Sequence, residues 1–242
     1  MVSMAVSAQV SNLHSLLLGI TTEKLRRLEY ERIPWVPALR GLPPHLIPGV
    51  ICEAVGTVPR EDCCLQRIAR LRCWLLRWHR DTFWRLHQLR AAPDNDECAA
   101  ILTRMADSLR LRKRDATLAW TTYDDAITAC LLTEERAHVP LEHSVVYVLM
   151  RPSCPLLGVH YLGVGMKEPV LVALRAALGY DALELSSVQE ESILEVLLSA
   201  DRVLWQSLEL QGKAQCLEGT PHSTTDSQAG SSADAAASVP VG

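Results

Sequence analysis

The stretch Ser144–Gly165 reads SVVYVLMRPSCPLLGVHYLGVG and carries the clearest strand signal of this sequence. Two apolar runs, Val145–Met150 and Leu157–Val164, flank a segment that contains Pro152 and Pro155. Valine and tyrosine fit a pleated sheet, whereas proline interrupts one. The pattern therefore predicts an antiparallel strand pair joined by a proline-containing turn.

The composition indicates an ordinary globular protein. The chain has 242 residues, 48% of them hydrophobic, which suffices for one domain or two small ones. Its formal net charge of −4 argues against a uniformly basic nucleic-acid binder. We find no apolar run long enough to cross a membrane and no secretory signal, and so expect a soluble intracellular protein with no membrane partner. The sequence does not distinguish nucleus from cytoplasm, and it leaves the oligomeric state open.

Eight cysteines are scattered along the chain without a C-x-x-C pair. The nearest approach to a zinc pattern is Cys63, Cys64 and Cys73 with His79. Zinc sites use closely spaced ligand pairs, whereas free cysteines pack well as small apolar groups. We therefore expect buried free thiols.

The fold predicted from these patterns is a mostly helical α+β protein. Residues 1–140 are expected to form a helical region with a packed Pro-rich loop at 34–59 and a basic helix at 62–91, because apolar residues there recur every three or four positions. Further helices are expected at 96–118 and 120–135.

The second half is expected to hold a smaller unit and a tail. Residues 141–211 are predicted to form a small α/β unit with a two- or three-stranded antiparallel sheet, in which a helix at 169–178 precedes a final helix from about 186 to 211. Residues 212–242 are rich in Ser, Ala, Gly and Thr and are predicted to be disordered.

The basic helix allows three interpretations. Arginine pairs with phosphates and tryptophan stacks on bases, which favours DNA or RNA binding. Arginine stems also cover apolar surface, so the same face is consistent with solvated or internally paired arginines, or with an acidic protein partner. The candidate nucleic-acid-binding residues are Arg67, Arg70, Arg77, Arg80 and Arg85.

The strand pair also carries a family resemblance. Val146-Tyr147, followed by a turn and then Tyr161-Leu162-Gly163, resembles the two strand motifs that name the GIY-YIG nucleases. The resemblance covers about residues 145–211 and implies a small α/β unit that cleaves a phosphodiester with one divalent metal, such as Mg²⁺.

Carried over onto this sequence, the resemblance implies that Tyr147 and Tyr161 lie near the attacking water and that Arg175 steadies the phosphate. Either Glu191 or Glu195 takes the metal position, and the sequence does not choose between them. The first motif lacks its glycine, so an inactive relative is an equal alternative.

The sequence thus supports two functional hypotheses. The first is a nucleic-acid-associated protein with a GIY-YIG-like phosphodiesterase unit, active or inactive. The alternative is a non-enzymatic helical protein-interaction module that uses the Arg/Trp-rich helix face, with the two tyrosines serving only as half-buried strand residues.

Overall fold

The computed structural model describes residues 4–31, 33–78, 82–112, 114–123, 125–135, 144–162 and 165–190. All of them belong to the unit Met1–Leu204, and the second unit, Trp205–Gly242, lies outside the described residues, as does the predicted tail. Within the described residues, no helix combines the length and apolar character needed to span a bilayer.

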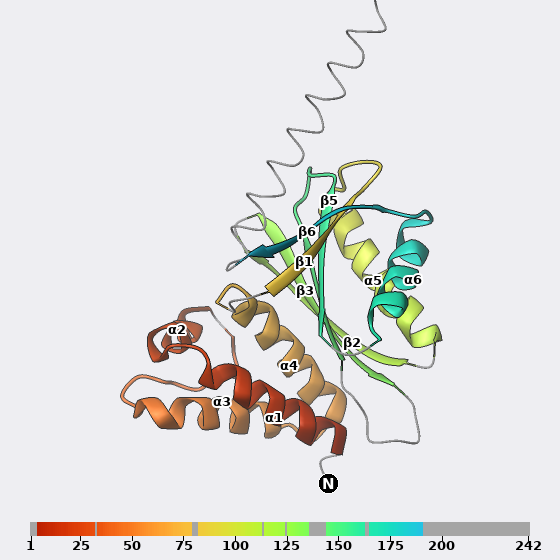
Figure 1. Ribbon diagram of the computed structural model, residues 1–242. Coiled ribbons are helices and arrows are strands. Elements are labelled where there is room, and N and C mark those ends of the chain that lie inside the picture. The colour runs from red at the N-terminus through yellow and green to blue at the C-terminus, as the bar shows by residue number, and fades with distance from the viewer. Residues whose placement is uncertain are drawn as a thin grey trace, which may run out of the picture. The chain divides into compact units, whose positions relative to one another are not determined.

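A layer of helices forms the N-terminal part of the chain (Figure 1). Their apolar faces share one core with one side of the sheet. Pro48 lies in the first turn of α3, where the missing amide hydrogen costs nothing. The elements of this layer are α1 (Met4–Leu18), α2 (Thr22–Arg27), η1 (Leu28–Glu31), η2 (Pro44–Leu46), α3 (Ile47–Gly56) and α4 (Glu61–Leu76).

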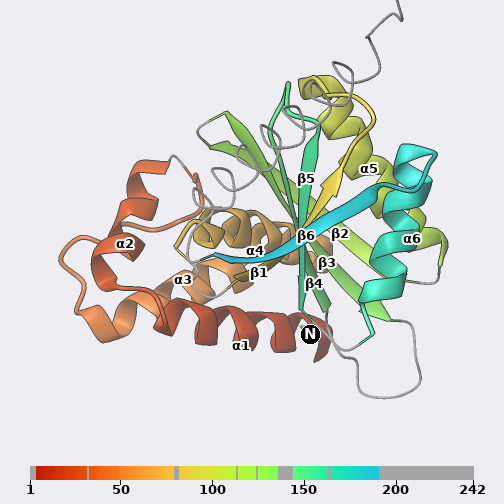
Figure 2. The same cartoon turned by 45° about the horizontal axis from the view of Figure 1, so that its top comes forward.

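The remainder is built around one six-stranded sheet with the order β2-β3-β4-β5-β1-β6. Every neighbouring pair of strands is antiparallel. Figure 2 shows β6 alongside β1 at one edge, and β2 forms the opposite edge. The strands are β1 (Thr82–Gln88), β2 (Arg114–Tyr123), β3 (Ala126–Glu135), β4 (Ser144–Met150), β5 (Leu156–Leu162) and β6 (Leu183–Glu190).

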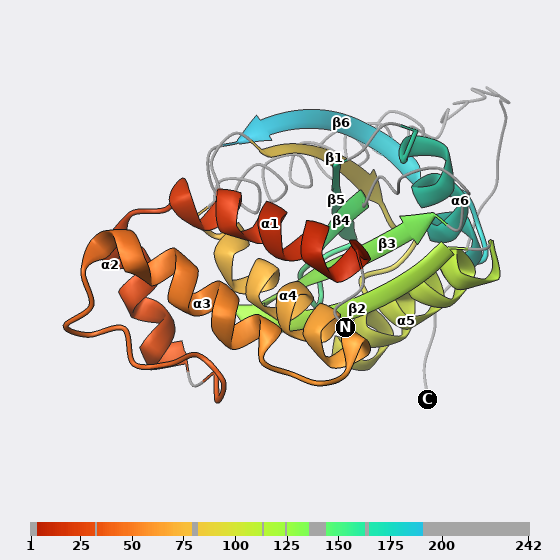
Figure 3. The same cartoon turned by 90° about the horizontal axis from the view of Figure 1, so that it is seen from below.

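Helices cover both faces of this sheet (Figure 3). The N-terminal layer, with α4 innermost, packs on one side, which we call the α4 face. Helices α5 (Asn95–Leu111) and α6 (Lys167–Leu178) pack on the other, which we call the α5 face. Alternate residues of β4 serve the two cores, so Tyr147 lies on the α4 face and Val146 on the α5 face.

Two predicted elements are confirmed. Strands β4 and β5 form an antiparallel pair in the predicted place, with Val148 opposite Val159. The helix predicted at 169–178 is α6, which begins two residues earlier, at Lys167. Gly179 caps it with a φ of +73°, the left-handed conformation that glycine adopts at low cost.

The predicted fold class is wrong in the size of the sheet, which has six strands rather than two or three. Residues 62–91 are not one helix, because α4 ends at Leu76 and β1 follows. In β1, Trp84 and Leu86 belong to the α4-face core, and the residues between them point to the other face. This strand period of two is hard to recognise in the sequence, because the helical spacing of the preceding apolar residues continues into it.

The helix predicted at 120–135 is also wrong, since these residues form most of the β2–β3 hairpin. Asp125, just before β3, has a φ of +60°, a conformation that Asp tolerates in turns. The helix predicted at 96–118 ends at Leu111, and 186–190 belong to β6. The Pro-rich loop at 34–59 packs on the core but contains α3.

Candidate functional site

The two tyrosines of the predicted nuclease site lie on opposite faces of the sheet. Tyr147 is opposite His160, and Tyr161 is opposite Val146, in the β4–β5 register. Directly opposed residues in an antiparallel pair point to the same side, and the next pair points to the other. Tyr147 therefore belongs to the α4-face core, whereas Tyr161 packs against the α5-face core.

Tyr147 is enclosed in the interior, with an exposed fraction of 3%. Its hydroxyl accepts a hydrogen bond from Nη1 of the buried Arg72 at 3.2 Å, and the His160 ring stacks on it at 5.8 Å between centroids. Burial raises the pKa of Tyr147 well above its ordinary value, an effect that the Arg72 charge reduces only in part. The phenol thus stays protonated and serves packing and hydrogen bonding.

Tyr161 and Arg175 have other partners. Tyr161 is half-buried, and the Arg85 guanidinium lies 5.5 Å from the centre of its ring. Arg175 on α6 is exposed and donates through Nε to Asp181. The structure therefore does not bring Tyr147 into a cleft with Tyr161.

The two predicted metal ligands, Glu191 and Glu195, lie outside the described residues. Among residues 4–190, with the gaps given above, no group of three His, Cys, Asp or Glu side chains has an arrangement that could hold a metal ion.

The described candidate nucleic-acid-binding arginines lie on α4, just after its end and on β1. Arg67 donates to the Ala54 carbonyl oxygen at 2.7 Å and lies over the Trp35 ring. Arg70 is exposed on α4, whereas Arg85 lies on β1. Arg80 falls outside the described residues.

Arg77, the remaining member of that set, is held in an aromatic enclosure. Its guanidinium carbon lies 4.9 Å from the ring centre of Trp74, 4.4 Å from that of Trp78 and 5.0 Å from that of Tyr123. It also forms an ion pair with Glu31, and only 11% of its side chain is exposed. Arg77 thus joins the end of α4 to η1 and to β2, and its charge is taken up within the fold.

Several of the described arginines form ion pairs within the chain. In the part of the chain that the structure describes, seven pairs join an arginine to an acid. Each such pair cancels a charge that phosphate binding would use.

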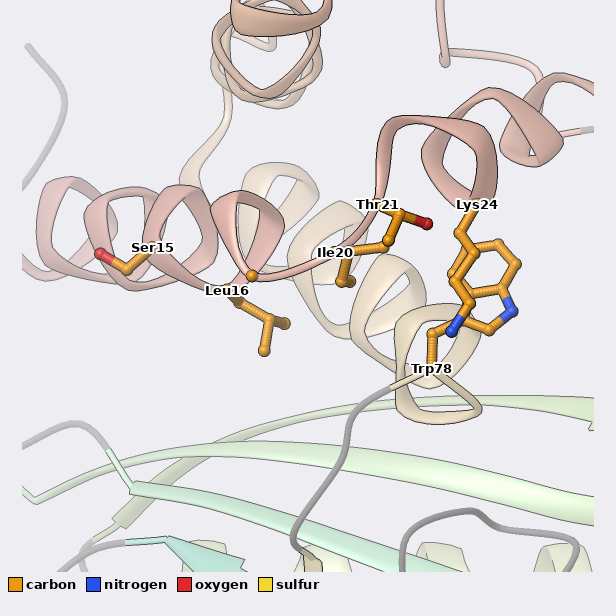
Figure 4. A pocket seen from close by; sticks show the side chains of 7 residues that line it. Ser15, Leu16, Ile20, Thr21, Lys24 and Trp78 are labelled. Carbon is orange, nitrogen blue, oxygen red and sulfur yellow. The ribbon is translucent and has the colours of Figure 1, made fainter.

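A hollow of about 410 Å³ lies beside Trp78 (Figure 4). Helix α1 ends at Leu18, and the chain turns through Gly19, whose amide donates to the Leu16 carbonyl oxygen at 3.1 Å, before α2 begins. This turn and the end of α4 leave a gap between them. Its walls are Ser15, Leu16, Gly19, Ile20, Thr21, Lys24 and Trp78.

The lining of this hollow combines one cation with apolar surface. Lys24 takes part in none of the ion pairs found among the described residues, although Glu23 precedes it. Leu16, Ile20 and the Trp78 indole supply the apolar wall, and Figure 4 shows Lys24 and Trp78 on its α2 side. An ammonium beside aliphatic and indole surface suits a carboxylate that carries an apolar neighbour.

Sequence reasoning did not find this hollow. The residues come from three separate elements, so only the tertiary fold brings them together.

Comparisons with known proteins give no family. No protein-family model matches the chain, and no curated protein matches it either.

Proposed function

We propose that this chain is a non-enzymatic binding protein, and that the hollow beside Trp78 receives an acidic and apolar segment of a protein partner. The observation that carries this proposal is the hollow itself, in which Lys24, which has no ion-pair partner among the described residues, lies beside the apolar groups of Leu16, Ile20 and Trp78. A pocket of this size holds one or two side chains of a peptide. Its wall is about equally polar and apolar, with Ser15 and Thr21 beside the apolar groups, so it suits a segment that carries both a carboxylate and an apolar side chain.

The nuclease and nucleic-acid hypotheses have weaker support. Tyr147 keeps its proton in the interior, and Tyr161 faces the other helical layer. Of the six predicted functional arginines, five lie among the described residues, and four of these contact groups of the same chain. These contacts favour an architectural role for the arginines that sequence analysis assigned to phosphate chemistry.

The test measures binding of fluorescein-labelled peptides by anisotropy at about 0.15 M salt, where surface charges are partly screened. One peptide alternates aspartate with leucine, a second replaces the aspartates by lysine, and a third replaces the leucines by serine. We expect the first to bind best, because it alone supplies both the carboxylate and the apolar side chain.

Lys24→Glu is the matched variant and should weaken binding of the acidic peptide by about tenfold or more. Lys167→Glu is the control, since it makes the same charge change at an exposed residue of α6, in the other helical layer. Equal losses in both variants would indicate net charge alone and would contradict the proposal.

The competing functions are measured in parallel. Labelled DNA and RNA duplexes are titrated under the same conditions, and a supercoiled plasmid is incubated with Mg²⁺ and with Mn²⁺. Tight duplex binding that weakens steeply with salt would favour the nucleic-acid hypothesis instead. Plasmid cleavage that is lost in Glu191→Gln or Glu195→Gln would restore the nuclease hypothesis.

A further inference from the structure

Strand β2 forms an edge of the sheet, and its outward backbone groups can be assigned. The β2–β3 pairing runs without a shift from Arg114 opposite Glu135 to Tyr123 opposite Ala126. In a hairpin with a two-residue turn the closing pair is hydrogen bonded, so Tyr123 directs its amide and carbonyl groups toward β3. The even-numbered residues of β2 therefore direct theirs outward.

The first half of this edge is already covered by side chains. The Ala116 carbonyl oxygen accepts from Nε and Nη2 of Arg110 at 3.1 and 2.9 Å. The Leu118 carbonyl oxygen accepts from Nε2 of Gln66 at 2.9 Å. Both acceptors lie at even positions, which agrees with the assignment from the hairpin.

The second half is open among the described residues. No side chain of the described residues caps the backbone of Trp120 or Thr122 in the way that Arg110 and Gln66 cap the first half, and Trp120 is 47% exposed. The segment from Ala119 to Tyr123 reads AWTTY and has no charge, proline or bulge. Proteins usually protect a free edge with one of these devices, because an open edge accepts another strand.

We propose that the open half of β2 pairs with the same segment of a second copy of this chain, antiparallel and about a two-fold axis at Thr121. In this register Trp120 of each copy is opposite Thr122 of the other. Both residues direct their backbone groups outward, so each opposition is a hydrogen-bonded pair, and the two pairs supply four hydrogen bonds. At the axis, Thr121 of one copy lies opposite Thr121 of the other, and this central pair makes no backbone hydrogen bonds across the interface.

The segment is complementary to itself in its side chains as well. Trp120 lies on the same side of β2 as Ala116, which belongs to the α5-face core, so both indoles project on one side of the joined sheet. They are diagonal neighbours across the axis, a distance that aromatic rings bridge. Threonine opposite threonine at the centre places no like charges together.

The same segment of a second copy fits the open half of β2 better than a longer strand from a different protein would. A strand that extended over Leu118 and Ala116 would displace Gln66 and Arg110, whereas the symmetric pairing is centred beyond them. The uncharged segment also offers no charge pattern that would select a different partner. Because the overlap is short, we expect a weak dimer that forms as the concentration rises.

Sedimentation velocity of the full chain, from about 1 to about 500 μM, tests the proposal. We expect a shift from monomer to dimer over this range. Thr122→Pro removes an outward amide donor without touching a β3 hydrogen bond, and should weaken dimerisation by about tenfold or more. Leu111→Lys is the control, because it removes an 86% exposed leucine outside the edge and should leave the dimer unchanged.

A cross-link fixes the register independently. Thr121→Cys, in a chain that also carries Cys63→Ser and Cys216→Ser, should form a disulfide-linked dimer under mild oxidation, since facing residues at the axis have close Cβ atoms. Thr57→Cys in the same background should not.

A chain that retains its circular dichroism spectrum and stays monomeric throughout would overturn the inference, whatever else covers the edge. Dimers that form equally in Thr122→Pro would overturn it too. Neither result bears on Lys24 or the hollow beside Trp78.

Discussion

The two faces of the sheet are stabilised by different chemistry. On the α5 face the core consists mostly of Leu, Ile, Val, Met and Ala from α5, α6 and the strands. On the α4 face, Arg72 is buried with an exposed fraction of 4% and bonds to Tyr147, which stacks on His160. The α4 face thus adds a polar arrangement with specific geometry to its apolar core, whereas the core of the α5 face is apolar throughout.

The buried polar groups of the α4 face explain why sequence analysis predicted catalytic residues on the strand pair. Tyr147, which sequence analysis assigned to catalysis, belongs instead to a buried network: it accepts from Arg72 of α4 and stacks on His160, which contacts the Phe83 carbonyl oxygen of β1. Buried polar groups of this kind must be satisfied, and doing so demands one particular arrangement.

Trp84→Ala should destabilise the α4 face most. The side chain is fully buried, and its ring packs so closely on Gly158 that a Cβ added there would lie 3.2 Å from it. We expect the free energy of unfolding to fall by about 3–5 kcal/mol in urea titrations. Ile101→Val, a smaller deletion in the α5-face core, should cost about 0.5–1.5 kcal/mol. A loss below about 1.5 kcal/mol for Trp84→Ala would contradict the packing described.

A double-mutant cycle at Arg72 and Tyr147 should reveal the polar network. Tyr147→Phe leaves the buried guanidinium without its acceptor, and Arg72→Met leaves the phenol without its donor, so each should cost about 1–3 kcal/mol. The double variant should cost clearly less than the sum, because it leaves neither group unsatisfied. Additive losses would show that the 3.2 Å contact does not couple the two residues.

Alkaline pH should weaken the α4 face through its buried thiols. Burial raises the pKa of Cys130 from 9.0 to about 12 and places that of Cys73 well above its ordinary value. The folded chain then holds these protons more tightly than the unfolded chain, so stability is complete below about pH 9 and falls as the pH rises. Each group contributes at most about 1.4 kcal/mol per pH unit.

The comparison variant for this effect is Cys130→Ala. Its stability profile between pH 9 and pH 11 should be flatter than that of the wild type, with chemical unfolding measured at each pH. An unchanged slope would mean that Cys130 titrates normally in the folded state. The α5 face has its own such group, Cys98, whose pKa burial raises to about 11, so part of the slope should remain.

Arg175→Ala should have the smallest effect. Its ion pair with Asp181 leaves the side chains 62% and 71% exposed, and such surface pairs contribute about 0–1 kcal/mol. We expect thermal unfolding and peptide binding to change little. A large loss of either would give Arg175 a role that its position on α6 does not explain.

The elements that could be predicted from the sequence are those in which the local residue pattern matches the burial that the residues have in the fold. Strands β4 and β5 read as apolar runs because both of their faces are buried, and α6 carries its glycine cap at Gly179. Strands β1, β2 and β3 were missed because Arg, Thr and Ala dilute their alternation, and the neighbouring helical spacing continues into them.

The candidate site was largely beyond prediction. The sequence put Tyr147 and Tyr161 together because they lie near each other along the chain, but the register of two strands decides which face each side chain takes. Lys24 and Trp78 are far apart in sequence, and neither carries a motif, so their joint contribution to one hollow follows only from how α2 and α4 pack.

The strand order has a consequence for how the chain folds during synthesis. Strand β1 pairs with β5 and β6, although the whole segment from Leu89 to Pro155 separates it even from β5, so its neighbours emerge from the ribosome long after it does. The β2–β5 meander closes from local hairpins, whereas inserting β1 requires distant segments to meet, which slows folding. Until then β1 exposes two unpaired edges and Trp84, so nascent chains that end before Leu156 should depend on chaperones.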